Sequence, residues 1–197
     1  YDTQYLNSSI DAASIGDGGL TNMTAAMAGA ISVTADNAGS TFSLKDATGT
    51  SDVISFTSTT TAGTGKVDVS TVTVDGFETL NFAANTGEKL AATSGSSTRS
   101  TLSFTGADKL KTVNVTGSKS AIVTLSSNSA KVTTLDASGI TGGAIITTAG
   151  HTGALTVTGS AAKDTFTVNA VGTNGTTTFN AGAGKDTFSG TIANLSA

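Results

Sequence analysis

The chain has 197 residues and a formal net charge of −4, and it contains 24 Gly but no Pro, Cys or Trp. It has no apolar run of about 18 residues that could span a membrane, and no basic patch with interleaved aromatic residues. We therefore expect neither membrane insertion nor a nucleic-acid partner. Regularly spaced Val, Ile, Leu and Phe distinguish the chain from disordered sequences. Because Thr and Val favour strands, we predict an all-β protein.

The first 30 residues differ from the rest of the chain. Met23 and Met27 lie four positions apart, which is typical of one face of a short helix. We predict that residues 1–30 form an irregular or partly helical cap. The start at Tyr1 lacks the charged and apolar regions of a signal peptide, so we expect an internal segment of a longer polypeptide.

From residue 31 to residue 197 the sequence changes to short, alternating segments typical of strands. Each segment ends in or near Gly, Asn, Asp or Ser, the residues that most often turn a chain. The predicted strands lie within residues 30–36, 40–46, 52–58, 66–76, 79–85, 101–106, 112–117, 121–127, 133–139, 144–150, 154–159, 164–170, 176–182 and 186–191.

Apolar residues also recur at a fixed spacing of 22 residues, with one step of 11. The residues at this spacing are Leu80, Leu102, Val113, Leu135, Val157 and Phe179. One repeat of this kind cannot bury its apolar face alone, but stacked repeats bury it against each other. We therefore predict a right-handed parallel β-solenoid with about 22 residues per coil over residues 31–197.

The tetrapeptide Lys-Asp-Thr-Phe occurs twice, and its two copies place Asp164 and Asp186 22 residues apart. Phe166 and Phe188 have the same spacing, so we expect the two rings to stack in the core. The two aspartates would lie side by side at a turn. Adjacent carboxylates repel each other unless a cation lies between them.

The second copy is close to a glycine-rich nonapeptide whose turns bind calcium. Gly182 and Gly184 would shape the turn, and Asp186 would supply oxygen ligands, which suit Ca²⁺. The first copy, at Asp164, keeps fewer of the glycines.

A weaker echo of the same pattern occupies residues 47–54 and contains Asp52, with Asp46 nearby. We predict that these aspartates also contribute to calcium binding. The alternative interpretation, for all four aspartates, is a solvated turn former without a ligand.

Catalytic candidates are few. His151 is the only histidine, so no site can use two of them, and we expect it in an exposed turn. Asp75 and Glu78 could form the carboxylate pair of a glycosidase. The simpler interpretation places Glu78 in solvent, with Phe77 and Leu80 in the core. We therefore do not expect an enzyme.

Several motifs carry a family resemblance. Residues 44–85, with the run Gly-Phe-Glu-Thr-Leu-Asn at residues 76–81, resemble a segment of the RTX-type, RsaA-like S-layer proteins of Gram-negative bacteria. Residues 132–142 are similar to a recurring segment of the same proteins, and residues 179–190 resemble their calcium-binding nonapeptides. The resemblance extends over roughly residues 40–190.

The resemblance implies a secreted structural protein, exported by a type I system, that assembles with copies of itself into a two-dimensional lattice on the bacterial cell surface. It implies that Ca²⁺ orders the fold and the lattice contacts, and it allows a cell-surface polysaccharide as a further partner. Similar Thr-rich solenoids occur in RTX adhesins and biofilm-matrix proteins. The alternative function is therefore a module that binds glycans or other cells.

Overall fold

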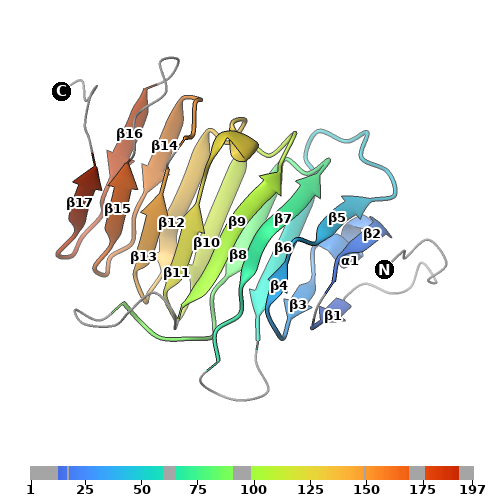
Figure 1. The fold of residues 1–197 in the computed structure, drawn as a ribbon, viewed down its shortest axis with the longest axis horizontal. Coiled ribbons are helices and arrows are strands. Elements are labelled where there is room, and N and C mark those ends of the chain that lie inside the picture. Colours follow the sequence, from blue (N-terminus) through green and yellow to red (C-terminus); the bar gives the residue numbers. More distant parts are fainter. Residues whose placement is uncertain are drawn as a thin grey trace.

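The chain folds into two parallel β-sheets that lie one over the other, as Figure 1 shows. The computed structural model describes residues 13–16, 18–59, 65–90, 99–148, 150–168 and 176–190. Successive strands lie side by side along the long axis, from the N-terminal strands at one end to the C-terminal strands at the other. The chain alternates between the two sheets, so the prediction of a parallel β-solenoid is confirmed.

The strands divide between the sheets as follows. The eight-stranded sheet contains, in spatial order, β1 (Ala13–Ile15), β3 (Ile31–Val33), β6 (Val53–Ser58), β8 (Thr79–Ala83), β10 (Thr112–Gly117), β12 (Thr134–Ile140), β14 (Leu155–Thr158) and β16 (Thr177–Asn180). The nine-stranded sheet contains β2 (Leu20–Met23), β5 (Thr41–Leu44), β7 (Val69–Asp75), β9 (Ser100–Gly106), β11 (Ala121–Thr124), β13 (Ala144–Thr147), β15 (Thr165–Val168) and β17 (Thr187–Gly190), with β4 (Asn37–Ala38) beside β7.

Helical structure is minor in the described part of the chain. It consists of α1 (Ala25–Ala28) and a 3₁₀ turn at Ser127–Ser129. Neither is long or apolar enough to cross a membrane.

The core lies between the two sheets, and it arises from the alternation of buried and outward-facing side chains along most of the strands. In β10, Val113 and Val115 are fully buried, whereas Thr112 and Asn114 lie on the outer face. This alternation follows from the two-residue period of a strand. Each buried Val or Leu contributes about 1.5–3 kcal/mol relative to an exposed one. Every segment predicted as a strand contains a strand in the structure.

The register of the C-terminal coils confirms the predicted stacking. Leu135 pairs with Val157, and both side chains are completely buried. The rings of Phe166 and Phe188 stack with their centroids 5.7 Å apart. Phe188, however, is 41% exposed, because β17 is the last strand described at its end of the sheet.

Coil length is less uniform than predicted. Partners such as Asp164 and Asp186 are 22 residues apart, but hydrogen-bonded partners in the middle of the chain are 32 or 33 residues apart. The additional residues lie in the connections from β6 to β7 and from β8 to β9. As a result, Leu80 pairs with Val113, and Leu102 belongs to the other sheet, where it pairs with Val123.

The N-terminal region already contributes to both sheets. Strands β1 and β2 lie within the segment predicted as a cap. They nevertheless belong to the sheets, because β1 pairs with β3 and β2 pairs with β5. The predicted helical stretch is α1, whose first turn is capped by the Thr24 hydroxyl, which accepts a hydrogen bond from the Met27 N–H at 3.2 Å. Met23 itself ends strand β2.

The outer face of the eight-stranded sheet is polar and repeats in register. One row contains Thr79, Thr112, Thr134, Thr156 and Thr178. The adjacent row contains Asn81, Asn114, Asp136, Thr158 and Asn180. Asn114 Nδ2 donates to Asn81 Oδ1 at 2.9 Å, so neighbouring coils are also joined through their outer side chains. This face therefore presents nearly the same short, mostly uncharged side chains on five successive strands.

Candidate functional site

The first copy of Lys-Asp-Thr-Phe places its aspartate inside the protein. Asp164 is fully buried immediately before β15. Its Oδ1 accepts a hydrogen bond from the Ala144 N–H at 2.6 Å, and its Oδ2 accepts one from the Ser160 N–H at 2.6 Å. The Ser160 hydroxyl lies 2.9 and 3.0 Å from the two carboxylate oxygens. Both oxygens are therefore supplied with donors from the protein.

Burial and hydrogen bonding act in opposite directions on this carboxyl group. Burial raises the pKa of Asp164 above its usual value, and the hydrogen bonds from Ala144 and Ser160 partly offset that effect. The neighbouring Asp186 raises the pKa further by charge repulsion. The two aspartates are thus neighbours, as the 22-residue spacing predicts.

The second copy repeats the arrangement on the next coil. Asp186 is half-buried, and its Oδ1 accepts a hydrogen bond from the Asp164 N–H at 2.9 Å. In each copy, the carboxylate therefore binds a backbone N–H of the preceding coil. Gly182 has a positive φ of 85°, and a Cβ there would overlap the carbonyl oxygen of Ser160. Gly184 also has a positive φ, and a Cβ there would overlap the carbonyl oxygen of Ala162. Both glycines therefore allow close approach of adjacent coils.

The same kind of contact joins coils elsewhere in the solenoid. Gly76 N–H donates to Asp108 Oδ1 at 3.0 Å, and Asp68 N–H donates to Asp36 Oδ1 at 3.0 Å. An ionised carboxylate is an acceptor only, and buried backbone donors require a partner. Aspartate at the turns therefore has a structural role that accounts for part of its recurrence.

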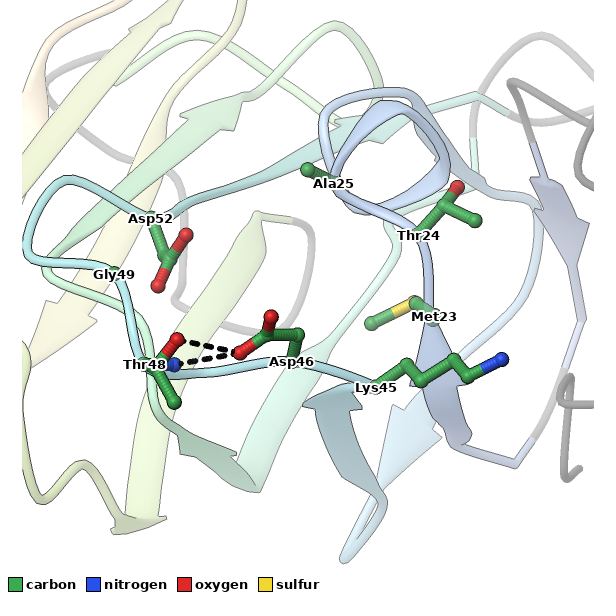
Figure 2. Close-up of a pocket in the computed structure, with 8 residues that line it drawn as sticks. All are labelled: Met23, Thr24, Ala25, Lys45, Asp46, Thr48, Gly49 and Asp52. Carbon is green, nitrogen blue, oxygen red and sulfur yellow. Dashed lines mark hydrogen bonds between the residues drawn. The ribbon is translucent and has the colours of Figure 1, made fainter.

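The loop of residues 46–52 differs from these turns. It lies beside a pocket of about 710 Å³ lined by Met23, Thr24, Ala25, Lys45, Asp46, Thr48, Gly49 and Asp52. Figure 2 shows the carboxylates of Asp46 and Asp52 facing the space between them, whereas the Lys45 ammonium group points away. The structure thus brings together two predicted ligands in the loop between β5 and β6, whereas Asp164 and Asp186 precede β15 and β17, near the other end of the solenoid (Figure 1).

Asp46 is exposed and held in place by its own loop. Its Oδ1 accepts hydrogen bonds from the Thr48 hydroxyl at 2.7 Å and from the Thr48 N–H at 3.1 Å. These two bonds lower the pKa of Asp46 below its usual value, with the hydroxyl contributing most. The carboxylate is therefore ionised at neutral pH and available to a ligand through its other oxygen.

Asp52 carries a buried oxygen without a partner. Its Oδ2 is buried and accepts no hydrogen bond from any described residue. A Cβ added to Gly49 would lie 2.7 and 2.8 Å from the two carboxylate oxygens, so a side chain at residue 49 would displace this carboxylate. A buried, unpartnered carboxylate oxygen is costly. A bound cation would relieve this cost, and the loop therefore fits an oxygen-liganded ion such as Ca²⁺.

The sequence did not indicate all of the residues around this pocket. Thr48 follows Asp46 by two positions, which is the spacing at which an Asp side chain binds the backbone of a turn, so that signal was present. Glu78 was predicted to face solvent, which is wrong. It is buried at 7% exposure, and its Oε2 accepts a hydrogen bond from the Asp52 N–H at 2.8 Å. Phe77 and Leu80 are in the core, as predicted.

His151 was predicted to be exposed, and that prediction is also wrong. It is 5% exposed, and backbone groups of Ser129 and Val132, on the preceding coil, lie beside its ring. Neither ring nitrogen has a well-aligned hydrogen-bond partner among the described residues. Burial lowers its pKa, and nearby backbone groups of Val132, Ser129 and Gly153 oppose this only in part.

The comparisons with known proteins give no match. No family model, no curated protein and no solved structure matches this chain. Within the described residues, no group of three or more His, Cys, Asp or Glu side chains converges on one point. The functional conclusion therefore depends on the fold, the polar faces and the carboxylates of the loop at residues 46–52.

Proposed function

We propose that this chain is a structural module of an RTX-type bacterial surface layer, which assembles with copies of itself into a calcium-dependent two-dimensional lattice outside the cell. The observation that carries the proposal is the outer face of the eight-stranded sheet. Its two rows of short polar side chains repeat in register over five strands. A surface that repeats at every coil suits a partner that also repeats, such as a neighbouring copy in an array.

The interior supports a scaffolding role. The core is one continuous cluster that runs from Ile15 to Phe166, and buried Val, Leu, Ile and Phe fill it along the solenoid. In such repeat proteins, each coil is stabilised by its neighbours. A rigid, elongated body of this kind transmits load and maintains spacing between subunits.

Calcium has a defined role in this proposal. The ion would link parts of the chain that carry carboxylates and would thereby favour the assembled form. Oxygen ligands from aspartate and threonine match the coordination preference of Ca²⁺. With a net charge of −4, the protein also benefits from a divalent cation between neighbouring copies.

The test is negative-stain electron microscopy of the purified protein with millimolar CaCl₂ and then with a chelator. We expect ordered sheets that dissolve when calcium is removed. Dispersed particles under both conditions would contradict the lattice. In that case, binding to a glycan array or to whole cells would favour the alternative function, an adhesin or biofilm-matrix module.

A further inference from the structure

We propose that Ca²⁺ binds in the loop of residues 46–52, through Asp46 and Asp52, and that the aspartates of the Lys-Asp-Thr-Phe turns hold adjacent coils together without the ion. The inference rests on the proposed function only in its use of calcium. By the nonapeptide pattern, Asp186 is the best candidate for a calcium ligand and the loop of residues 46–52 is a weaker one. The inference reverses this ranking.

The first step is the supply of hydrogen-bond donors around each carboxylate. At Asp164, a cation would have to displace the N–H groups of Ala144 and Ser160, which lie 2.6 Å from the carboxylate oxygens. Those donors are buried and would lose their partner. At Asp186, Oδ1 accepts the hydrogen bond from the Asp164 N–H at 2.9 Å, so an ion on that oxygen would share it with the contact between the coils. Calcium binding at Asp164 would therefore break contacts that join two coils.

The second step is the opposite situation at Asp52. Its Oδ2 is buried and has no partner among the described residues. The protein nevertheless fixes the position of this residue, since its N–H donates to Glu78 Oε2 at 2.8 Å. Gly49 leaves the space that the carboxylate occupies. A cation would supply the missing partner without displacing any protein hydrogen bond from that oxygen.

The third step is the composition of the pocket. Asp46 is oriented by Thr48, and its carboxylate faces the same space as that of Asp52 (Figure 2). Two carboxylates and a nearby hydroxyl group form a hard, oxygen-only donor set. Ca²⁺ accepts backbone carbonyl oxygens and water as its remaining ligands, and extracellular sites with few charged ligands bind it at about 0.1–1 mM. A site of this affinity is filled outside cells.

The test is isothermal titration calorimetry with CaCl₂ on the wild-type protein and on three variants. Asp46→Asn and Asp52→Asn are expected to raise the dissociation constant about tenfold or more, because each removes one charge from the site. Asp186→Asn is the matched control and is expected to leave calcium affinity unchanged. Loss of binding in Asp186→Asn, with wild-type affinity in Asp52→Asn, would overturn the assignment.

A further variant guards against misfolding of Asp52→Asn. Gly49→Ala places a Cβ against the Asp52 carboxylate and leaves all charges in place. It is expected to weaken calcium binding about tenfold by shifting that carboxylate. Asp46 is exposed, so Asp46→Asn is expected to keep the wild-type far-UV circular dichroism spectrum. Wild-type affinity in both Asp46→Asn and Gly49→Ala would refute the loop site.

Electron microscopy of the same variants separates this inference from the proposed function. Calcium binding that depends on Asp46 and Asp52, without sheets under any condition, would refute the lattice and leave the assignment. Sheets that still require calcium in Asp52→Asn, but are lost in Asp186→Asn, would refute the assignment and leave the lattice.

Discussion

The Lys-Asp-Thr-Phe turns and the loop of residues 46–52 place the same residue type in glycine-containing turns, but their carboxylates have different partners. Asp164 is fully buried and accepts hydrogen bonds from two coils. Asp52 has one buried oxygen without any partner in the described residues. The coil next to a turn, and not the turn sequence itself, thus decides whether its carboxylate is available to a ligand.

The two regions also differ in the spacing between hydrogen-bonded partners on adjacent coils. Near the Lys-Asp-Thr-Phe turns the coils have the regular 22-residue spacing, so each carboxylate meets a backbone N–H of the coil before it. Around residues 46–52 the hydrogen-bonded partners are 26 residues apart. The pocket beside this loop is lined by Met23, Thr24 and Ala25 of the preceding coil together with residues of the loop itself.

The largest effect is expected from the aromatic stack within the repeat. Phe166 is completely buried and contacts both Phe179 and Phe188, with ring centroids 5.7 Å apart in each case. Phe166→Ala should lower the free energy of unfolding by about 3–5 kcal/mol through cavity formation. Phe188→Ala, the matched control, should cost clearly less because that ring is 41% exposed. Urea denaturation measures both, and equal losses would contradict the stacking order.

A smaller effect is expected from the carboxylate of the first copy. In Asp164→Asn, the NH₂ group of the new side chain would face a backbone N–H that the carboxylate now accepts, so two donors would meet. This should lower the free energy of unfolding by about 1–3 kcal/mol. Asp186→Asn should cost less, because Asp186 is only half-buried and accepts a single hydrogen bond. Thermal unfolding in the presence of a chelator provides the comparison. A larger loss in Asp186→Asn would show that the outer copy, not the inner one, holds the coils together.

Much of this arrangement could be predicted from the sequence. Alternation of apolar and polar residues locates β10, β12 and β14, because a strand buries every second side chain. The 22-residue spacing gives the correct pairing of Leu135 with Val157, since neither coil contains an insertion. The same spacing fails for Leu80 and Leu102, which lie in different sheets. Connections of variable length disturb a period without changing the strands themselves.

The state of each carboxylate could not be predicted in the same way. The donors around Asp164 include Ala144, 20 residues earlier, and the partner of the Asp52 N–H is Glu78, 26 residues later. Contacts at such separations depend on the register between coils. Similarly, His151 is buried by residues of a neighbouring coil, so its turn-like sequence wrongly indicated exposure.

The smallest effect on stability is expected from lowering the pH. It should appear around His151 and not in the loop of residues 46–52. Burial lowers the pKa of His151 below 6.5, so the folded state favours the neutral ring. Its stabilising contribution is complete above pH 6.5 and is lost as the pH falls through the lowered pKa. Hydrogen-exchange protection factors, which correct for the slower chemical exchange of amides in acid, should therefore fall around β13 and β14 on acidification, and His151→Gln should abolish this change. A fall in protection around residues 46–52 instead would contradict the assignment to His151.

The most direct test of the central claim is a crystal structure of the protein grown with millimolar calcium, with long-wavelength anomalous data to locate the ion. The structure predicts an anomalous peak between Asp46 and Asp52, with the hydrogen bonds from Ala144 and Ser160 to Asp164 intact. A peak beside Asp186, and none in the loop of residues 46–52, would contradict the account.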